Sequence, residues 1–324
     1  MHYRSVSDLN LTISHGLSMI PKDTDLVVGI PRSGLLVANL VSLALNLPLA
    51  DLDGFLDGRI LAAGKTRRRD TFDRSAADFR RVLVIDDSIL NGHAMQAAKE
   101  KIAQLGTPER FFFCAVYGPE QDVIDVDLIM ERVPSPRIFQ WNMMHHRVLQ
   151  KACFDIDGVL CFDPTSDQND DGEAYTQFIQ TARPLLVPGQ KIAHLVTSRL
   201  ERYRPQTEAW LAANGIEYGK LWMLDLPNAA ERRRQGAHGS FKAGVYRQLN
   251  ETIIFVESEE RQAIEIARLS GKPVLSIESH SVVYPNRYLE FEEQARRRLI
   301  RMRERLSSER SGWRRKLKRV LKRS

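Results

Sequence analysis

Two adjacent carboxylates, Asp86 and Asp87, directly follow the apolar run Val82–Ile85 and precede a loop that reaches Gly92. The run predicts a buried strand, and acids at the carboxyl end of a strand face the crevice where open α/β sheets bind ligands. A helix beginning near Gly92 would present backbone N–H groups to a phosphate dianion. The carboxylates beside it can then hold sugar hydroxyls or Mg²⁺. The alternative is that the two acids only cap a turn.

A second glycine-bounded turn, Gly29–Gly34, lies between another apolar run and another helical pattern. Backbone N–H groups in such a turn suit a diphosphate, and Arg32 can clamp its charge. Two turns of this kind, in this order, favour a phosphate-and-diphosphate ligand over simple turn capping.

A third pattern places Asp155 and Asp157 just after an apolar run, separated by one residue. One carboxylate can attack phosphorus as a nucleophile while the other gives the leaving alkoxide its proton. Mg²⁺ would screen the repulsion between the nucleophile and the phosphate. Three later residues can complete such a site: Thr197 as a donor to the phosphoryl oxygens, Lys242 as a countercharge, and Glu257 as a metal ligand.

The elements that must position these residues form two α/β blocks of alternating apolar runs and helical patterns. In the first block we predict strands over 26–30, 81–87 and 111–116, helices over 33–46 and 92–105, and a long polar loop over 53–80. In the second block we predict a strand from 151 to the acids, strands over 191–196 and 252–256, and helices over 204–213, 240–249 and 262–270. The predicted fold class is α/β, with two Rossmann-like, doubly wound parallel-sheet domains and a C-terminal helical basic tail. The predicted boundaries are 1–148, 149–284 and 285–324.

Composition excludes several classes of protein. With 43% hydrophobic and 27% charged residues, the chain of 324 residues is neither disordered nor fibrous. Three cysteines without a C-x-x-C pattern predict a reducing, cytoplasmic setting and no zinc site. Residues 291–324 hold 14 Lys and Arg against 4 Asp and Glu, whereas the rest of the chain holds 33 against 37. A mildly acidic body argues against a specific nucleic-acid partner.

The first block resembles type I phosphoribosyltransferases, whose signature is a hydrophobic run, two acids and a threonine- and glycine-rich loop. The resemblance implies phosphoribosyl diphosphate (PRPP) as ligand, with Asp86 and Asp87 at the ribose hydroxyls and residues 53–80 as a flap. Where the family has Thr-Thr-Gly-Gly-Thr, this chain has Leu-Asn-Gly-His-Ala over 90–94. For His93 we expect a solvated loop histidine rather than a catalyst. The residues implied to bind PRPP are Arg32, Ser33, Gly34, Arg67, Arg68, Arg69, Asp86, Asp87, Ser88, Asn91, Gly92 and His93.

Residues 150–278 resemble phosphatases of the haloacid dehalogenase superfamily. The resemblance implies Asp155 as the nucleophile, Asp157 as the acid/base, and Thr197 and Lys242 at the phosphate. It also implies Mg²⁺ held by Asp155, Asp157 and Glu257, where the family usually has aspartate at the last position. The intervals between these residues leave no room for a large cap domain, which suits a phosphate on a bulky molecule. A degenerate, structural domain is the alternative.

The C-terminal segment 313–324 reads as a basic amphipathic helix. Trp313, Leu317, Val320 and Leu321 share one helical face, and Lys and Arg fill the other. This pattern favours peripheral contact with the anionic inner face of the cytoplasmic membrane, and a solvated or RNA-binding tail is the alternative.

A phosphatase tethered to a phosphoribosyltransferase would act on the transferase product at high effective concentration. We therefore predict a bifunctional enzyme that transfers 5-phosphoribosyl from PRPP to a glycan hydroxyl with inversion and then hydrolyses the 5-phosphate. The product would be a β-ribofuranose unit on a lipid-linked acceptor, and the fusion resembles enzymes that make such units in bacterial surface glycans. Two alternatives stay open: an enzyme of nucleotide or modified-nucleoside metabolism, and a regulator that senses PRPP without turnover. The oligomeric state is left open.

Overall fold

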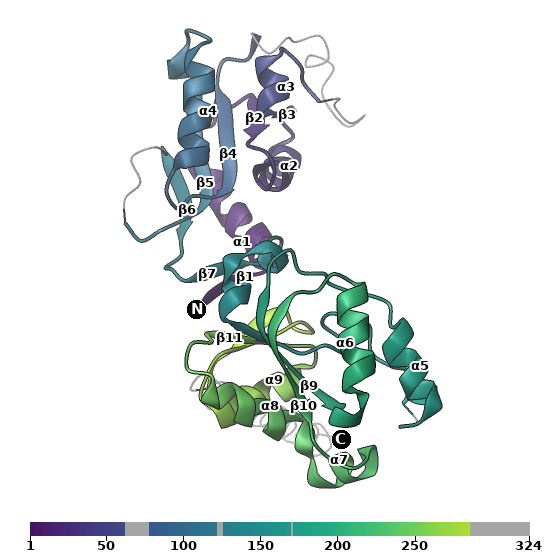
Figure 1. Cartoon of the computed structure of the whole chain (residues 1–324). Helices are drawn as coiled ribbons and strands as arrows, with labels where there is room; N and C mark the ends of the chain where they lie inside the picture. Colours follow the sequence, from purple (N-terminus) through teal and green to yellow (C-terminus); the bar gives the residue numbers. More distant parts are fainter. Residues whose placement is uncertain (62–77, 122–125, 170, 286–324) are drawn as a thin grey trace, which may run out of the picture. The chain divides into compact units, whose positions relative to one another are not determined.

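The computed structural model describes residues 1–61, 78–121, 126–169 and 171–285 (Figure 1). The chain forms two compact units, and the division between them falls after Met143, close to the predicted boundary at 148. The predicted flap residues Arg67, Arg68 and Arg69 and the predicted helix 313–324 lie outside the described residues.

Unit 1 contains a five-stranded sheet with the order β3-β2-β4-β5-β6, and all of its described strand pairs are parallel. A separate two-stranded parallel ladder pairs β1 with β7. The strands are β1 (His2–Arg4), β2 (Leu26–Gly29), β3 (Leu49–Asp51), β4 (Val82–Ser88), β5 (Phe111–Gly118), β6 (Leu128–Arg132) and β7 (Arg137–Phe139). The helices are α1 (Val6–Gly16), α2 (Gly34–Leu45), α3 (Leu52–Leu56) and α4 (His93–Ala103).

Strand β4 shows why the apolar runs of unit 1 are continuous rather than alternating. Val82 and Val84 pack into one core with residues of α3 and α4, whereas Leu83 and Ile85 pack into another with residues of α1 and α2. Because helices cover both faces of the sheet, every position from Val82 to Asp87 is buried, and only the last residue, Ser88, is half-buried.

Unit 2 contains a six-stranded sheet with the order β10-β9-β8-β11-β12-β13, parallel except for the edge strand β13. Figure 1 shows α5 and α6 on the opposite side of this sheet from α8 and α9. The strands are β8 (Ala152–Phe154), β9 (Ile192–Leu200), β10 (Tyr218–Leu224), β11 (Ile254–Glu257), β12 (Val274–Ser276) and β13 (Ser281–Val283). The helices are α5 (Glu173–Thr181), α6 (Arg204–Ala213), α7 (Ala229–Gln235), α8 (Ala237–Gln248) and α9 (Glu260–Ser270).

Both units reverse their strand order next to a strand that ends in acids. In unit 1 the chain passes from β2 to β3 on one side and then returns to β4 on the other side of β2. In unit 2 it passes from β8 through β9 to β10 and then returns to β11 beside β8. Such a switch point opens a crevice at the carboxyl ends of the two neighbouring strands. The predicted α/β class with parallel sheets is confirmed.

Several local predictions needed correction. The predicted loop over 53–80 begins inside a helix, α3, because the Asp51 carboxylate caps it by accepting from the Gly54 N–H at 2.7 Å. Strand β9 continues to Leu200, past the predicted end at 196, so Thr197 lies within the strand. Strand β10 was not predicted. In the described part of the chain, no helix combines the length and apolarity needed to cross a membrane.

Two candidate active sites at the strand ends

In unit 1 the two adjacent acids lie at the end of β4 and are both buried. The backbone N–H of Asp87 donates to Asp86 Oδ1 at 2.8 Å, which fixes the side chain of Asp86 against its own strand. Ser33 Oγ donates to Asp87 Oδ1 at 2.8 Å. The predicted diphosphate turn and the predicted ribose acids are therefore joined by a direct hydrogen bond.

Gly34 begins α2 directly beside these acids. A Cβ at this position would lie 2.8 Å from the Ile85 carbonyl oxygen and 3.0 Å from Asp86 Oδ1, closer than real Cβ atoms approach. The close contact of the helix with the strand end thus requires glycine, and it brings the turn over 29–34 against the acids. Arg32 in this turn is exposed, and its peptide bond with Pro31 is cis.

The loop after β4 forms a pocket of about 190 Å³ in front of helix α4. Gly92 precedes this helix with φ of 77°, a left-handed conformation that glycine adopts freely. The first N–H groups of an α-helix have no acceptor within the helix, so they are available to a phosphate. The residues that line the pocket are Asp86, Ser88, Ile89, Leu90, Asn91, Gly92, His93, Ala94 and Met95. Hence Asp86 and the four predicted phosphate-loop residues share one cavity, and His93 is exposed.

Two residues of this site were missed by the sequence analysis. Trp141 Nε1 donates to Asp87 Oδ2 at 2.7 Å, and its ring stacks on Phe139. The buried Arg137 donates to the carbonyl groups of Ile89 and Val133, so a guanidinium supports the base of the loop that was predicted to bind phosphate. Both residues are about fifty positions from the acids and belong to no periodic pattern, so the sequence carries no local signal for them.

Burial, the charge of Asp87 and a side-chain hydrogen bond with it raise the pKa of Asp86 to about 8, although the backbone N–H of Asp87 opposes them. Between pH 4 and pH 8 the folded chain therefore holds a proton that unfolded Asp86 has lost, and this group lowers stability as the pH rises. Asparagine has no carboxyl to titrate, so Asp86→Asn should not lose this stability. We expect the free energy of unfolding of the variant, measured relative to the wild type, to be higher at pH 8 than at pH 5 by at least about 1 kcal/mol. Urea unfolding at both pH values measures this gain, with the exposed Asp23→Asn as control. An unchanged difference between variant and wild type would show that Asp86 ionises normally.

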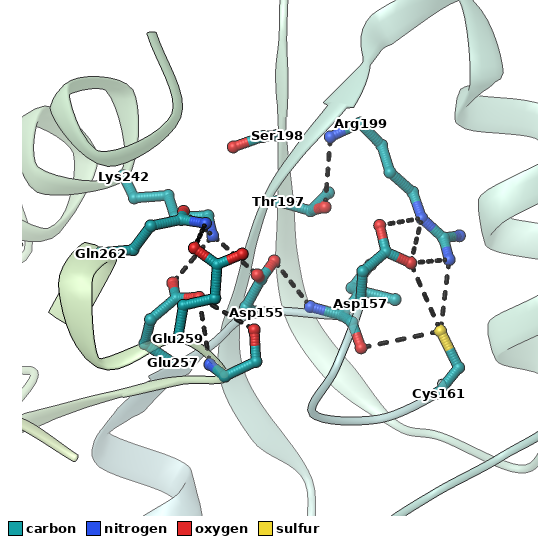
Figure 2. Close-up of polar contacts among 12 residues, drawn as sticks. Asp155, Asp157, Cys161, Thr197, Ser198, Arg199, Lys242, Glu257, Glu259 and Gln262 are labelled. Atoms are coloured by element: carbon teal, nitrogen blue, oxygen red, sulfur yellow. Dashed lines mark hydrogen bonds and ion pairs between the residues drawn. The ribbon is translucent and has the colours of Figure 1, made fainter. Parts of the chain in front are cut away.

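In unit 2, Lys242 of helix α8 joins the two strand ends that flank the switch point (Figure 2). Its Nζ donates to Asp155 Oδ2 at 2.6 Å, Glu257 Oε2 at 2.8 Å and Gln262 Oε1 at 3.0 Å. Asp155, Lys242 and Glu257 are all buried. The structure thus brings together three of the predicted residues around one ammonium group.

Asp157 lies on the other side of this cluster and is bound by Arg199 (Figure 2). Arg199 Nη2 donates to Asp157 Oδ1 at 2.6 Å, and Nε lies 3.1 Å from Oδ2. Arg199 is 1% exposed, whereas the side chain of Asp157 is 19% exposed, so a buried guanidinium holds a carboxylate that borders the pocket. An arginine within the apolar strand β9 is a signal that sequence reasoning could have used, because a buried guanidinium requires an acid partner.

The surroundings of Asp155 and Asp157 shift the pKa values of the two carboxyls in opposite directions. Burial raises the pKa of Asp155 to about 7; Glu257 and Asp157 act in the same direction, and Lys242 opposes them. For Asp157 burial is outweighed by the charge and hydrogen bonds of Arg199, and its pKa is lowered. Arg199 therefore holds Asp157 ionised, and Asp157 can donate a proton only after it leaves this pair.

The oxygen donors of Asp155, Asp157 and Glu257 are of the type that Mg²⁺ prefers, but their arrangement does not fit a metal as it stands. Lys242 lies between Asp155 and Glu257, and Arg199 engages both oxygens of Asp157. Within the residues that the structure describes, no group of three or more His, Cys, Asp or Glu side chains could hold a metal ion. Mg²⁺ remains a prediction.

A pocket of about 350 Å³ opens beside this cluster. Asp155, Asp157, Thr197 and Lys242 all line it, so four of the predicted residues face one cavity, whereas Glu257 lies behind Lys242 and is fully buried. Thr197 Oγ1 accepts the Arg199 N–H at 3.2 Å, and its own proton can still be donated into the pocket. Asp86 and Asp155 therefore both face pockets rather than packed side chains.

Comparison with known proteins finds only partial similarities. No family model matches the chain. A transcriptional regulator GfcR from Methanococcoides burtonii is 28% identical over 92 residues, which cover 28% of this chain and 43% of that protein. The chain thus matches less than half the length of this relative.

Solved structures with some similarity include two phosphoribosyltransferases. A purine phosphoribosyltransferase from Pyrococcus horikoshii and a xanthine-guanine-hypoxanthine phosphoribosyltransferase from Helicobacter pylori each share 18% identity with the chain, at a TM-score of 0.32. Each match covers 43% of this chain and 92% of the other. Likenesses of this size do not identify a function.

Proposed function

We propose that unit 1 binds PRPP and transfers its 5-phosphoribosyl group to an acceptor hydroxyl. The observation that carries this proposal is the hydrogen bond from Ser33 in the turn over 29–34 to Asp87, beside the pocket that Asp86 shares with the loop over 88–95. A sugar with a phosphate on one side and a diphosphate on the other can reach all three elements. Asp86 and Asp87 would hold the ribose hydroxyls, and the loop would hold the 5-phosphate.

The transfer would proceed by attack of the acceptor oxygen on the anomeric carbon as the bond to the diphosphate breaks, and the proton of the acceptor hydroxyl would pass to the departing diphosphate or to solvent. Inversion of the α-configured donor yields a β-ribofuranoside. We propose a glycan hydroxyl as the acceptor, on a lipid-linked molecule. Transfer leaves the 5-phosphate on the sugar, a plain ribofuranose unit of a glycan lacks it, and unit 2 could remove it.

In unit 2 we propose hydrolysis of that phosphate. Asp155 would attack phosphorus and form an aspartyl phosphate as the P–O bond to ribose breaks. The ribose oxygen would take its proton from Asp157, once that carboxyl has left Arg199 and been protonated. Water would then hydrolyse the aspartyl phosphate, which releases phosphate and restores the Asp155 carboxylate. Thr197 can donate to the phosphoryl oxygens, while Lys242 holds Asp155 in place at 2.6 Å. Mg²⁺ would have a place here only if Lys242 and Arg199 released the carboxylates that they hold. Loss of hydrolysis on chelation by EDTA would show that the carboxylates rearrange to hold a metal, and undiminished activity would remove the metal from the scheme.

The regulator alternative has one structural observation in its favour. Both oxygens of Asp87 already accept hydrogen bonds, from Ser33 and from Trp141, which is an arrangement suited to holding a fixed ligand geometry. The partial match to a transcriptional regulator points the same way. A chain that binds PRPP without consuming it would follow this alternative.

Incubation of the full chain with PRPP and candidate acceptors, followed by mass spectrometry, separates these functions. A glycan that gains a phosphoribosyl mass and then loses phosphate supports the proposal. A nucleotide product indicates nucleotide or nucleoside metabolism, and unconsumed PRPP indicates a regulator. The double variant Asp86→Asn, Asp87→Asn should slow transfer at least ~10²-fold because the donor is no longer positioned, whereas the exposed Asp23→Asn should not change it.

A further inference from the structure

In unit 2, the N–H groups of Lys242 and Arg199 are largely engaged by protein acceptors, so few of them could bind a substrate phosphate. An ammonium carries three N–H donors, and those of Lys242 have three acceptors, Asp155, Glu257 and Gln262. Arg199 is directed at Asp157, with further contacts to Cys161 and Thr207. Donors for a substrate phosphate must therefore come in part from elsewhere in the pocket.

Two buried donors in this pocket have no hydrogen-bond partner. Arg232 of helix α7 is 6% exposed; its Nη1 donates to the Ser198 carbonyl at 2.8 Å, and its side chain also hydrogen-bonds Tyr175. Its Nε has no acceptor. Ser198 is 8% exposed, and its Oγ has no partner. Because an unsatisfied buried polar group is destabilising, such groups are uncommon and call for an explanation.

Both residues line the same pocket as Asp155 and Thr197. The carbonyl contact places the Arg232 guanidinium beside Ser198, the neighbour of Thr197 in strand β9. Arg232 Nε and Ser198 Oγ are themselves enclosed, so an anion in the pocket reaches them once these side chains turn toward it. A guanidinium N–H and a hydroxyl next to each other can then bind two oxygens of a tetrahedral anion, and charge-assisted bonds of this kind are the stronger ones.

We propose that Arg232 and Ser198 form the phosphoryl-binding subsite of the unit 2 pocket, with Arg232 as its principal cation. The inference rests on the proposed function in taking a phosphomonoester as ligand. It assigns a role to helix α7, which lies between β10 and α8 and supplies the arginine from outside the strand ends. Lys242 then positions Asp155 rather than binding the phosphate.

Hydrogen–deuterium exchange of the full chain, with and without inorganic phosphate, tests this subsite. Phosphate should protect the segments over 192–203 and 229–235. Arg232→Gln should weaken phosphate binding there about 10- to 100-fold through loss of a charge-assisted bond. The matched control is Arg234→Gln on the same helix, whose side chain is 73% exposed and pairs with Glu231. It should bind phosphate like the wild type.

Ser198→Ala is a second test in case Arg232→Gln does not fold. It should weaken phosphate binding about 5- to 10-fold. The inference is overturned if phosphate protects neither segment, or if folded variants of both residues bind phosphate as the wild type does. Arg232-dependent protection with no hydrolysis of ribose 5-phosphate would support the subsite while removing the phosphatase from the proposed function.

Discussion

Replacement of Lys242 by methionine should lower the free energy of unfolding by about 3–5 kcal/mol, the usual effect of removing one partner from a buried ion pair. The side chain of Lys242 is 2% exposed, and its Nζ lies 2.6 Å from Asp155 and 2.8 Å from Glu257. Methionine fills a similar volume but leaves two buried carboxylates without a countercharge. Chemical denaturation followed by circular dichroism measures the change.

The loss should be larger at pH 8 than at pH 5. Lys242 lowers the pKa of Asp155 in the wild type, so without the ammonium the pKa of Asp155 in the folded variant rises. The folded state then holds a proton that the unfolded state has lost, and stability falls as the pH rises. Lys101→Met is the control, since its ion pair with Asp53 is exposed on both sides and should contribute less than about 1 kcal/mol. If both variants unfolded at the wild-type denaturant concentration, the buried cluster would not hold unit 2 together.

The strand ends that carry the acids could be predicted, because burial of each strand on both faces requires a continuous apolar run that stops at the acids. In β4 both faces are covered by helices, so the run Val82–Ile85 is apolar throughout and stops where the chain reaches the crevice at Asp86. The same holds for Asp155 after β8 and Glu257 at the end of β11. Parallel sheets bury whole strands, and the first polar residue then marks the edge of the sheet.

Strand β10 shows where this signal fails. It contains Gly219 and Lys220, both exposed, at the edge of the sheet, where only one side pairs with a neighbour. Its sequence therefore lacks the continuous apolar run that marks the inner strands. The edge position, rather than any special sequence, explains why it was not predicted.

Lys242 was predicted near Asp155, but other contacts of the site residues could not be predicted, because they come from distant parts of the chain. Trp141 reaches Asp87 across 54 residues, and Arg232 reaches Ser198 across 34. Such contacts depend on how connecting segments return over the sheet, which no periodic pattern encodes. The commitment of Lys242 to three acceptors is likewise visible only in three dimensions, and it shifts the expected phosphate contact from Lys242 to Arg232.

The two candidate sites have the same place in their sheets and a similar buried acid. Each lies where the strand order reverses, and each buries an acid whose pKa is raised, Asp86 to about 8 and Asp155 to about 7. They differ in countercharge. Asp155 has a buried lysine in contact, which favours its ionised form and suits a nucleophile, whereas Asp86 is hydrogen-bonded by the Asp87 backbone and suits a sugar hydroxyl.

Replacement of Asp155 by asparagine should abolish phosphate hydrolysis, with a loss of at least ~10³-fold, while leaving transfer in unit 1 intact. Asparagine retains an oxygen that can accept the Ile156 N–H, which Asp155 Oδ1 accepts at 2.8 Å, but it is a far poorer nucleophile. With PRPP and an acceptor, this variant should therefore accumulate the phosphoribosylated product. Mass spectrometry detects it as a species heavier than the wild-type product by one phosphate.

Asp167→Asn is the matched control, because Asp167 is exposed and lies in the same insertion between β8 and β9. It should give the dephosphorylated product at the wild-type rate. If Asp155→Asn also released only dephosphorylated product, the phosphate would be removed without this carboxylate, and the division of labour between the two units would be wrong. If it accumulated the phosphorylated product, the order of the two reactions would follow directly, since the ester must be installed before it can be hydrolysed.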